Sequence, residues 1–396
     1  MKVEFETARE AAQRMGVTVR AVQKWAASGK IPGATRMGKA WMIPKLVSLI
    51  EEPGEHTGHM IDHISFRRPL PLTNGSFPPG EARAYAESLP DPDDRRIALG
   101  EYYYFTGNAE QAVEIAEEYM DSEDPSLAYS ARMICLYANL TMGHIRRAQF
   151  AAKAMYADLE AGIQSDSPPI LHAIGIFTAN VIATQIQLEI PQLPPLETYI
   201  RYLPGGMKQF SMYIMALQAY REKNYERCIA IADMGCALPL ESCVIAEVNC
   251  HMIAVCALMS QRKVEQAQAR MRRAWEIGGP DQMIMIPAEH YELLQGSLEI
   301  LMKRDYPQTF EKTIKLSQQY ANNKRWVQGH SPDHIVKERL TMKELTVATL
   351  YDRGWTALDI AQHMELSERT VRNYINTIYA KLGITDRKAL GQYMNE

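Results

Sequence analysis

The sequence lacks several features that define large classes of protein. Its six cysteines form no Cys-x-x-Cys pair, its formal net charge over 396 residues is only −4, and it contains no nucleophile elbow, His-Glu-x-x-His motif or dinucleotide fingerprint. A disulfide scaffold is therefore not expected, and no metal or cofactor site is predicted. We expect a protein that is not an enzyme.

A membrane segment is not indicated either. One stretch, residues 167–188, has no formal charge, but it contains two prolines, a histidine, an asparagine and two glutamines. We expect a buried helix there rather than a membrane span. The first residues, MKVEFETARE, are polar and acidic and do not resemble a signal peptide. The sequence thus predicts a cytoplasmic protein with no membrane partner.

The cysteines all lie between the two ends of the chain. They are Cys135, Cys228, Cys236, Cys243, Cys250 and Cys256. Free cysteine is among the most buried residue types, so the simplest interpretation is a set of small apolar core side chains. A redox-sensing thiol is the alternative, because five of the six lie between residues 228 and 256.

Charge is unevenly distributed along the chain. Residues 1–50 carry nine Lys or Arg against three Glu, and residues 337–396 carry nine against eight Asp or Glu, which leaves a net −11 on the rest. A basic head and an acidic body fit a DNA-binding end on a body that the phosphate backbone repels.

Residues 367–382, SERTVRNYINTIYAKL, indicate one amphipathic helix, with Ser367 where an N-cap belongs. Apolar side chains recur at helical spacing and predict a buried stripe at Val371, Ile375, Ile378 and Leu382. The opposite face carries Arg369, Arg372, Asn373 and Asn376. Such side chains can pair with base edges or reach phosphates. Taken alone, an ordinary surface helix fits this pattern equally well.

The preceding residues favour DNA binding. Thr341 and Glu344 have capping-box spacing, and the helix that they open is expected to stop at Gly354. Thr356 begins a short helix, and a tight turn at residues 365–366 leads into the amphipathic helix. This is the helix-turn-helix order, in which the second helix enters the major groove. Residues 384–390 suggest a closing helix.

Residues 337–394 resemble the DNA-binding domain of LuxR-type regulators. The matching stretches are LTMKE at 340–344, Gly354, DIA at 359–361, LSERTVRNY at 366–374, IYAKLGI at 378–384 and Arg387. The resemblance implies that bases are contacted by Arg372, Asn373 and Asn376, and the DNA backbone by Thr370 and Lys381. We also expect DNA contacts from Ser367, Arg369, Arg387 and Lys388. The family usually has His at the position of Tyr374, and some members have Lys at that of Asn376, so the base preference cannot be carried over.

Residues 1–50 predict a second self-contained unit. Thr7 and Glu10 have capping-box spacing, the chain turns at 16–17, and Thr18 caps a second helix that ends at Gly29. Two short runs, 34–37 and 40–43, are joined by Gly-Lys, and a Gly-first two-residue link suits a type II′ hairpin. Two helices and a small hairpin make a winged helix-turn-helix.

This unit resembles excisionase/MerR-like DNA-binding domains. The resemblance rests on TAREAAQRMGVTVRAVQKWAASGKIPG at 7–33 and on Arg36, Gly38, Trp41, Ile43 and Pro44. It implies that the groove is met by Arg20, Gln23 and Lys24, and phosphates by Arg36 and Lys39. Contact with a protein instead of DNA stays open for this unit.

Residues 51–80 are rich in proline and glycine and predict a linker. His56, His59 and His63 lie close together in it and could bind a metal. Because no Cys or supporting carboxylate stands in an obvious frame, a solvated linker is the simpler interpretation.

Residues 81–335 indicate helices that repeat loosely. Between Leu99 and Tyr119 the chain resembles a tetratricopeptide hairpin, a second unit follows thirty-six residues later, later units have drifted, and 160–205 shows no pattern. Stacked helix pairs bury a continuous core and leave a concave face. On that face we expect an effector to contact Tyr104, Tyr137, Tyr213, Tyr220 and Arg221, although the same residues suit a packed core.

The sequence therefore predicts a mainly α protein in four parts. They are a winged helix-turn-helix at 1–50, a linker at 51–80, a tetratricopeptide-like sensor or oligomerisation array at 81–335 and a four-helix LuxR-type domain at 336–396. We expect a homodimeric regulator of promoter DNA, with a small-molecule or peptide effector in the array and RNA polymerase as a candidate partner. The alternative is a tetratricopeptide scaffold with vestigial terminal domains, which steeply salt-dependent DNA binding would exclude.

Overall fold

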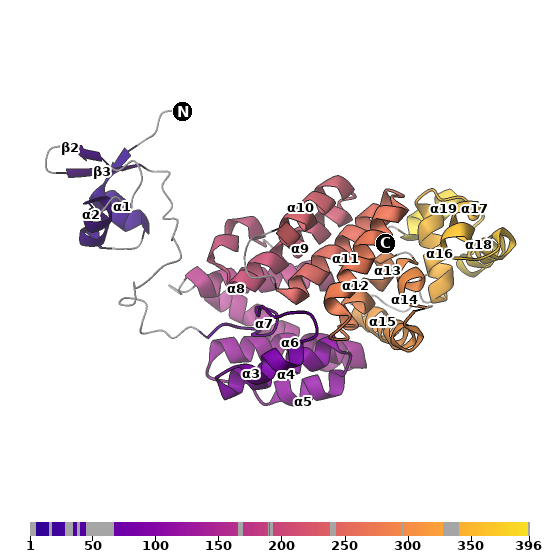
Figure 1. Ribbon diagram of the computed structural model, residues 1–396, viewed down its shortest axis with the longest axis horizontal. Helices are drawn as coiled ribbons and strands as arrows, with labels where there is room; N and C mark the ends of the chain where they lie inside the picture. The colour runs from indigo at the N-terminus through magenta and orange to yellow at the C-terminus, as the bar shows by residue number, and fades with distance from the viewer. Residues whose placement is uncertain are drawn as a thin grey trace. The chain divides into compact units, whose positions relative to one another are not determined.

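The computed structural model describes residues 5–15, 18–27, 35–37, 40–44, 67–164, 169–188, 190, 193–237, 243–294, 296–303, 305–327 and 340–394. The chain divides into two compact units, residues 1–65 and 66–396. The expected mainly α fold is confirmed, since helices predominate in these ranges (Figure 1). His56, His59 and His63, for which a solvated linker is a simpler interpretation than metal binding, lie outside the described residues.

In the first unit, two helices accompany a small antiparallel sheet. α1 (Ala8–Met15) and α2 (Val19–Ala27) are followed by β2 (Thr35–Met37) and β3 (Ala40–Pro44). Met37 pairs with Ala40, as a two-residue link requires, although residues 38–39 themselves lie outside the described ranges. A strand that we did not predict, β1 (Phe5–Thr7), pairs with β3 and gives the order β1-β3-β2. Three residues are too few to show the alternation that marks a strand.

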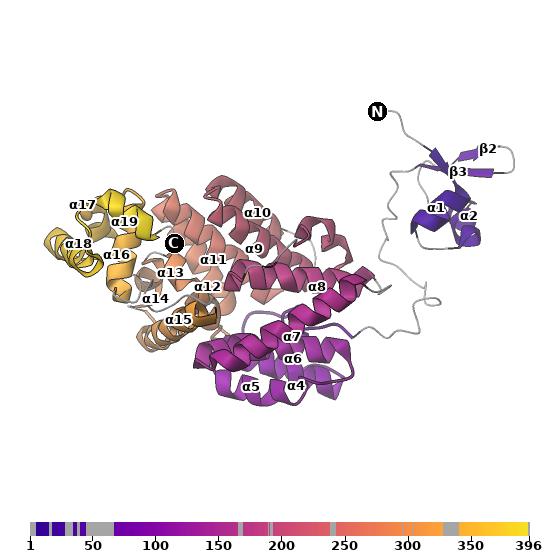
Figure 2. The ribbon, with the colours of Figure 1, turned by 180° about the vertical axis from the view of Figure 1, so that it is seen from behind.

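The second unit begins with a body of paired helices (Figures 1 and 2). The pairs are α4 (Pro92–Phe105) with α5 (Ala109–Glu117), α6 (Pro125–Met142) with α7 (Ile145–Gln164), α9 (Gly205–Arg221) with α10 (Tyr225–Ala237), and α11 (Val244–Ser260) with α12 (Val264–Gly278). α3 (Ala82–Ser88) precedes them, and α13 (Met285–Leu294), α14 (Ser297–Met302) and α15 (Pro307–Val327) follow. One cluster of buried apolar side chains runs through the unit from Leu70 to Leu390.

The four pairs share one turn geometry. At each turn the residues with positive φ are Gly107, Gly143, Lys223 and Arg262. The next residue then donates its N–H to a carbonyl five positions back, as Asn108 does to Tyr103 and Lys263 does to Leu258. This is the Schellman arrangement, which satisfies the last carbonyls of the first helix. The body is therefore a repeated helical hairpin, while its likeness to tetratricopeptide repeats stays a prediction.

The stretch without a readable pattern is irregular in the structure as well. α8 (Pro169–Val181) runs into a π-helical segment, η1 (Ile182–Ile186), and two 3₁₀ turns, η2 (Leu196–Thr198) and η3 (Ile200–Tyr202), precede α9. A π-helical segment changes the helical period, so the repeat cannot be followed through it. Ile176 and Ile186 are fully buried, so the charge-free stretch contributes to the core within its described residues. Across the described ranges, no helix combines the length and apolar character needed to span a bilayer.

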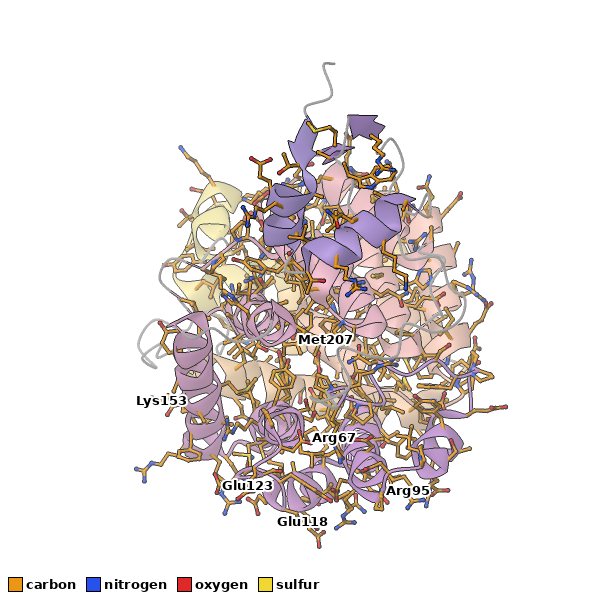
Figure 3. All side chains as sticks on the ribbon, turned by 90° about the vertical axis from the view of Figure 1, so that its left-hand side faces the viewer. Arg67, Arg95, Glu118, Glu123, Lys153 and Met207 are labelled. Carbon is orange, nitrogen blue, oxygen red and sulfur yellow. The ribbon has the colours of Figure 1, made fainter. Side chains whose placement is uncertain are left out.

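The predicted linker ends earlier than expected, because residues 67–74 pack into the body. Arg67, which Figure 3 labels, belongs to this segment. It lies 2.8 Å from Asp91 and 3.0 Å from both Asp94 and Asp124. Leu72 is fully buried although Pro69 and Pro71 stand just before it. Proline and glycine break a periodic pattern, but they do not prevent burial once the backbone groups find partners.

Those partners are on the first helices of three successive pairs. Leu70 donates its N–H to Ser130 Oγ on α6 at 2.9 Å. The Glu101 carboxylate on α4 accepts from the N–H groups of Leu72 and Thr73 at 2.8 and 2.9 Å. Met207 on α9 donates its N–H to Asn74 Oδ1 at 2.8 Å. The segment thus covers part of the surface on which an effector was expected.

The chain ends in four short helices. They are α16 (Met342–Asp352), α17 (Ala357–His363), α18 (Glu368–Leu382) and α19 (Arg387–Met394). The capping boxes at Thr341–Glu344 and Thr356–Asp359 are both formed, and Gly354 ends the first helix with φ +94°. The predicted order of helices is therefore confirmed.

Candidate nucleic-acid interface

α18 presents one buried and one exposed face. Its buried side chains are Val371, Ile375, Ile378 and Leu382. Its exposed polar side chains include Arg369, Arg372, Asn373 and Asn376. Both sets are those that helical periodicity predicts, because residues three and four apart share a face. The exposed set carries donors and acceptors that can meet base edges.

The start of α18 is held by short-range hydrogen bonds. Glu365 has φ +53° and Leu366 donates its N–H to the carbonyl of Ala361 at 2.9 Å, which closes the turn after α17. Ser367 Oγ accepts from the Thr370 N–H at 3.0 Å and lies 2.7 Å from the Thr370 hydroxyl. A capped first turn fixes the direction in which the following side chains point.

Arg372 has an ion-pair partner on its own helix. Its Nε and Nη2 lie 2.9 and 2.5 Å from Glu368 Oε1, and the two side chains are 67% and 40% exposed. Exposed pairs of this kind contribute little free energy. Arg372 can therefore leave Glu368 for a base or a phosphate at small cost.

Two of the predicted DNA contacts already have roles inside the domain. Lys381 donates to Glu344 Oε2 at 2.6 Å and so ties α18 to α16. Burial disfavours the Glu344 carboxylate, but Lys381 and the Thr341 N–H outweigh it and hold the pKa of Glu344 below its usual value. Arg387 is half-buried with its guanidinium 4.6 Å from the centre of the Tyr351 ring, whereas Lys388 is exposed.

In the first unit, α2 shows the same division of faces. Arg20, Gln23 and Lys24 are exposed, while Val22 and Ala26 are buried. Arg36 is exposed on β2. The predicted phosphate contact Lys39 lies outside the described residues.

The C-terminal domain is hydrogen-bonded to the body. Arg353, at the end of α16, donates to the Tyr220 hydroxyl of α9 at 2.6 Å and to Ser260 Oγ of α11 at 2.7 Å. Burial and the Arg353 charge act on Tyr220 in opposite senses, and burial raises its pKa to about 12, so the hydroxyl stays protonated near neutral pH. Tyr220, predicted as an effector contact, therefore binds the C-terminal domain through Arg353.

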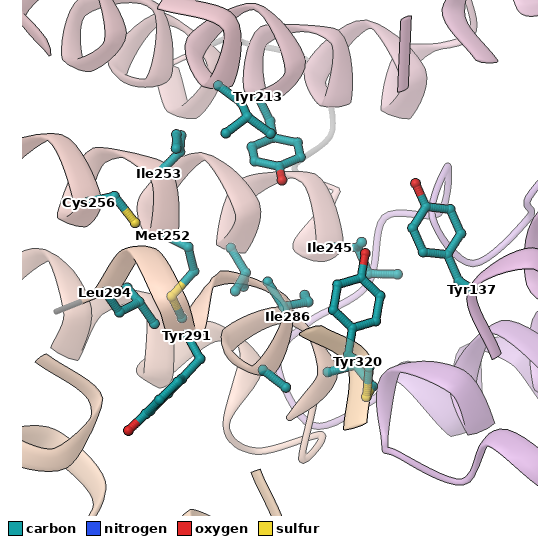
Figure 4. Packing of buried hydrophobic residues seen from close by; sticks show 14 of the residues in the cluster. Tyr137, Tyr213, Ile245, Met252, Ile253, Cys256, Ile286, Tyr291, Leu294 and Tyr320 are labelled. Carbon is teal, nitrogen blue, oxygen red and sulfur yellow. The ribbon is translucent and has the colours of Figure 1, made fainter. Parts of the chain in front are cut away.

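A cavity of about 70 Å³ lies inside the body. Polar side chains in its wall are Thr73, Glu101, Tyr104, Tyr137, Gln185, Asn249 and Glu289. Of the predicted effector contacts, Tyr104 and Tyr137 line it. The Tyr213 hydroxyl accepts from Gln185 Nε2 at 3.1 Å, and Figure 4 shows Tyr213 and Tyr137 among the buried side chains of the body. Arg221 is on the exposed surface and does not line the cavity.

The carboxyl groups of this cavity are strongly perturbed. Burial raises the pKa of Glu101 to about 7, against the hydrogen bonds from Thr73 and Leu72. Burial also raises the pKa of Glu289 to about 7, and the Tyr104 hydroxyl donates to this carboxyl group. Asn249 is 2% exposed, and its Oδ1 has no hydrogen-bond partner among the described residues. Neither Asn249 nor Glu289 was predicted, because each stands alone on a helix without a motif around it.

These features place helix-turn-helix folds at both ends of the chain, with a helix in each that exposes polar and basic side chains. The family model for bacterial regulatory proteins of the luxR family matches residues 338–394, and a helix-turn-helix domain model matches residues 7–46. Searches of curated proteins and of solved structures found no match to the chain. The C-terminal end is thus a LuxR-type helix-turn-helix domain and the N-terminal end an excisionase-like one. Such a C-terminal domain indicates a DNA-binding transcription regulator.

Proposed function

We propose that this protein reads promoter DNA with α18 and that a small effector in the body changes how the C-terminal domain is held. The observation that carries the proposal is the exposed set Arg369, Arg372, Asn373 and Asn376 on a capped helix of the LuxR-type domain. Those side chains would enter the major groove.

The effector is proposed to be small. The cavity of about 70 Å³ has room for about five water-sized positions, and residues 67–74 cover neighbouring surface that a peptide would need. The unpartnered Asn249 Oδ1 and the Glu289 carboxyl group are acceptors facing apolar walls. A ligand with an amine or ammonium group on a short apolar chain supplies the missing donor.

The two sites are proposed to communicate through Arg353. The Tyr220 and Ser260 hydroxyls that it binds belong to α9 and α11, and these helices also line the cavity at Met207, Phe210 and Asn249. An effector that favours one arrangement of α9 and α11 would change the equilibrium between held and released forms of the domain.

DNA affinity tests the first part. Genome-wide occupancy of the wild type would supply a site, and binding to that duplex would then be titrated over a range of salt. Arg372→Ala is expected to weaken binding about 10- to 100-fold through the loss of one bidentate base contact. The matched control is Arg83→Ala, because Arg83 Nε bonds Glu87 at 2.9 Å on an exposed helix just as Arg372 bonds Glu368.

Three outcomes would decide this test. Unchanged binding by Arg372→Ala, or no occupied site at all, would contradict the proposal and favour the scaffold alternative. Loss with Arg372→Ala alone would make α18 the reader. Equal loss with Arg20→Ala would show that the N-terminal domain must bind at the same time.

The effector is tested with isobutylammonium, and with isobutyrate as a control of opposite charge. We expect the amine alone to raise the melting temperature, and Asn249→Leu and Glu289→Gln to remove that effect. Equal effects of the two compounds would contradict the assignment. Arg353→Met should keep amine binding but abolish any influence of the amine on DNA affinity.

We further propose a homodimer that binds paired half-sites, contact with RNA polymerase, a cytoplasmic location and no catalytic activity. Paired half-sites favour two-fold symmetric proteins. Sedimentation of the protein with and without a duplex tests the dimer, and a monomer in both conditions would contradict it.

A further inference from the structure

Cys236 differs from the other cysteines in its surroundings. It is the partly exposed cysteine of the six, the other five being buried. Its Sγ lies 3.8 Å from His251 Nδ1 on α11 and 3.8 Å from an Nη of Arg270 on α12. A partly exposed sulfur between two basic side chains is the environment in which a cysteine is reactive.

A second thiol lies beside it. The Cys250 thiol is fully buried on α11, and Cys250 and Cys236 shift each other's pKa in opposite directions, with that of Cys236 lowered and that of Cys250 raised. The close approach depends on Gly235, because a Cβ there would stand 2.7 Å from Cys250 Sγ. α10 and α11 therefore bring a reactive sulfur, that of Cys236, close to a second thiol, that of Cys250, which can resolve the oxidised form.

We propose that Cys236 and Cys250 form a dithiol that hydroperoxides oxidise to a disulfide. This inference goes beyond DNA binding and does not depend on the effector cavity. It gives the chain a modification site that includes α11. The same helix binds Arg353 of the C-terminal domain through Ser260.

The electrostatics support the first step. The effect of the neighbouring Cys250 thiol outweighs burial, and His251 and Arg270 act in the same direction as Cys250, so the pKa of Cys236 lies well below that of an ordinary thiol. The surrounding acids are Glu247, 3.7 Å from His251 Nε2, and Asp233, 2.5 Å from Arg270. By contrast, burial raises the pKa of both Cys135 and Cys228 to about 12.

The chemistry balances in two steps. The Cys236 thiolate attacks one oxygen of the hydroperoxide, the S–O bond forms as the O–O bond breaks, and the departing hydroxide or alkoxide takes a proton from solvent. Cys236 is then a neutral sulfenic acid, so the negative charge that kept Cys250 protonated is gone. Cys250 loses its proton and attacks the Cys236 sulfur, and hydroxide leaves with that proton as water. Two thiols and one hydroperoxide give one disulfide, one water and one alcohol or second water.

Alkylation of the reduced full-length chain tests the first step. Iodoacetamide at pH 6, followed by peptide mass spectrometry, compares all six cysteines in one sample. An ordinary thiol is almost entirely protonated at this pH, so Cys236 is expected to react about tenfold faster or more than any other. Arg270→Met should slow Cys236 severalfold, and Arg273→Met, which removes an arginine paired with Glu276 on the same helix, should not.

Hydrogen peroxide tests the second step. We expect a Cys236–Cys250 cross-linked peptide from the wild type, a dimedone adduct at Cys236 from Cys250→Ser, and neither from Cys236→Ser. Because the alkylation comparison uses the unaltered chain, it decides the first step even if Cys250→Ser fails to fold. Reaction of Cys236 no faster than Cys228, or pairing with another cysteine, would overturn the proposal.

Discussion

The two helix-turn-helix domains begin their first helices in the same way. Thr7 donates its N–H to Glu10 Oε2 at 2.8 Å in α1, and Thr341 donates its N–H to Glu344 Oε2 at 2.6 Å in α16. Each glutamate N–H donates back to the threonine hydroxyl at 3.3 Å. From short-range sequence pattern alone the two starts are equivalent.

Their environments differ. Glu10 is exposed, whereas Glu344 is buried and also binds Lys381 of α18. The C-terminal domain is in turn hydrogen-bonded to the body through Arg353, while the N-terminal domain belongs to a compact unit of its own. The capping box of the N-terminal domain therefore stabilises the start of α1. In the C-terminal domain the corresponding glutamate also connects α16 to α18, and α16 in turn is bonded to the body.

The largest expected effect is at that connection. Lys381→Met should destabilise the C-terminal domain by about 2 kcal/mol, because it leaves the Glu344 carboxylate buried without its cation. Glu10→Gln should cost less than about 0.5 kcal/mol, because Gln still accepts from Thr7 in water. Hydrogen exchange of the α16 and α1 amides measures both. Equal effects of the two changes would show that burial of Glu344 is unimportant.

Acidification should act on two carboxyl sites in opposite directions. The pKa of Glu344 is lowered in the folded state, so its contribution is present above the usual pKa of 4.5 and is lost as the pH falls. The pKa of Glu289 is raised to about 7 in the folded state. As the pH rises from 4.5 toward 7, this carboxyl group loses its proton in the unfolded chain but keeps it in the folded one, so the free energy of unfolding falls.

A matched variant isolates the second effect. Burial lowers the pKa of the neighbouring His290 to about 4, and this residue acts in the opposite sense to Glu289. The melting temperature of the wild type should therefore be compared with that of Glu289→Gln, which keeps an oxygen for Tyr104. Between pH 5 and pH 7.5 the wild type should lose about 2–5 °C more than the variant. An identical pH dependence would show that Glu289 keeps an ordinary pKa.

The smallest expected effect concerns DNA. Glu368→Gln should raise affinity about 2- to 5-fold at low salt, because it frees Arg372 and removes a negative charge near the phosphates. The gain should shrink as salt is added. Glu87→Gln, which frees Arg83 far from α18, is the control. A fall in affinity would instead indicate that Glu368 accepts a hydrogen bond from a base.

Local chemistry explains what the sequence could predict. Thr341, Thr356 and Ser367 cap their helices by bonds to residues three positions away, so their roles can be inferred from spacing. The buried stripe of α18 follows from the helical period in the same way. Most of the C-terminal domain could therefore be derived before any coordinates.

Contacts between distant residues could not be derived in this way. Arg353 and Tyr220 are separated by 133 residues, and Asn74 and Met207 also by 133. No periodicity links such positions. The sequence therefore predicts an effector contact at Tyr220 and a linker at residues 67–74, and it does not reveal that the former binds Arg353 and the latter packs into the body. The cavity likewise depends on how several helices converge, which a loosely repeated pattern does not fix.

The turn at Arg262 differs from the turns of the first two hairpins because its side chain also contacts the C-terminal domain. Gly107 and Gly143 occupy the left-handed position of the first two hairpins, whereas Lys223 and Arg262 of the last two both adopt φ +61° with a full side chain. A Cβ placed on Gly354 would stand 2.6 Å from the Arg262 guanidinium, so that side chain lies against the C-terminal domain. Glycine would relax the backbone there but would remove the surface on which Gly354 rests. For anyone redesigning this chain, the last hairpin cannot be exchanged for a copy of the first.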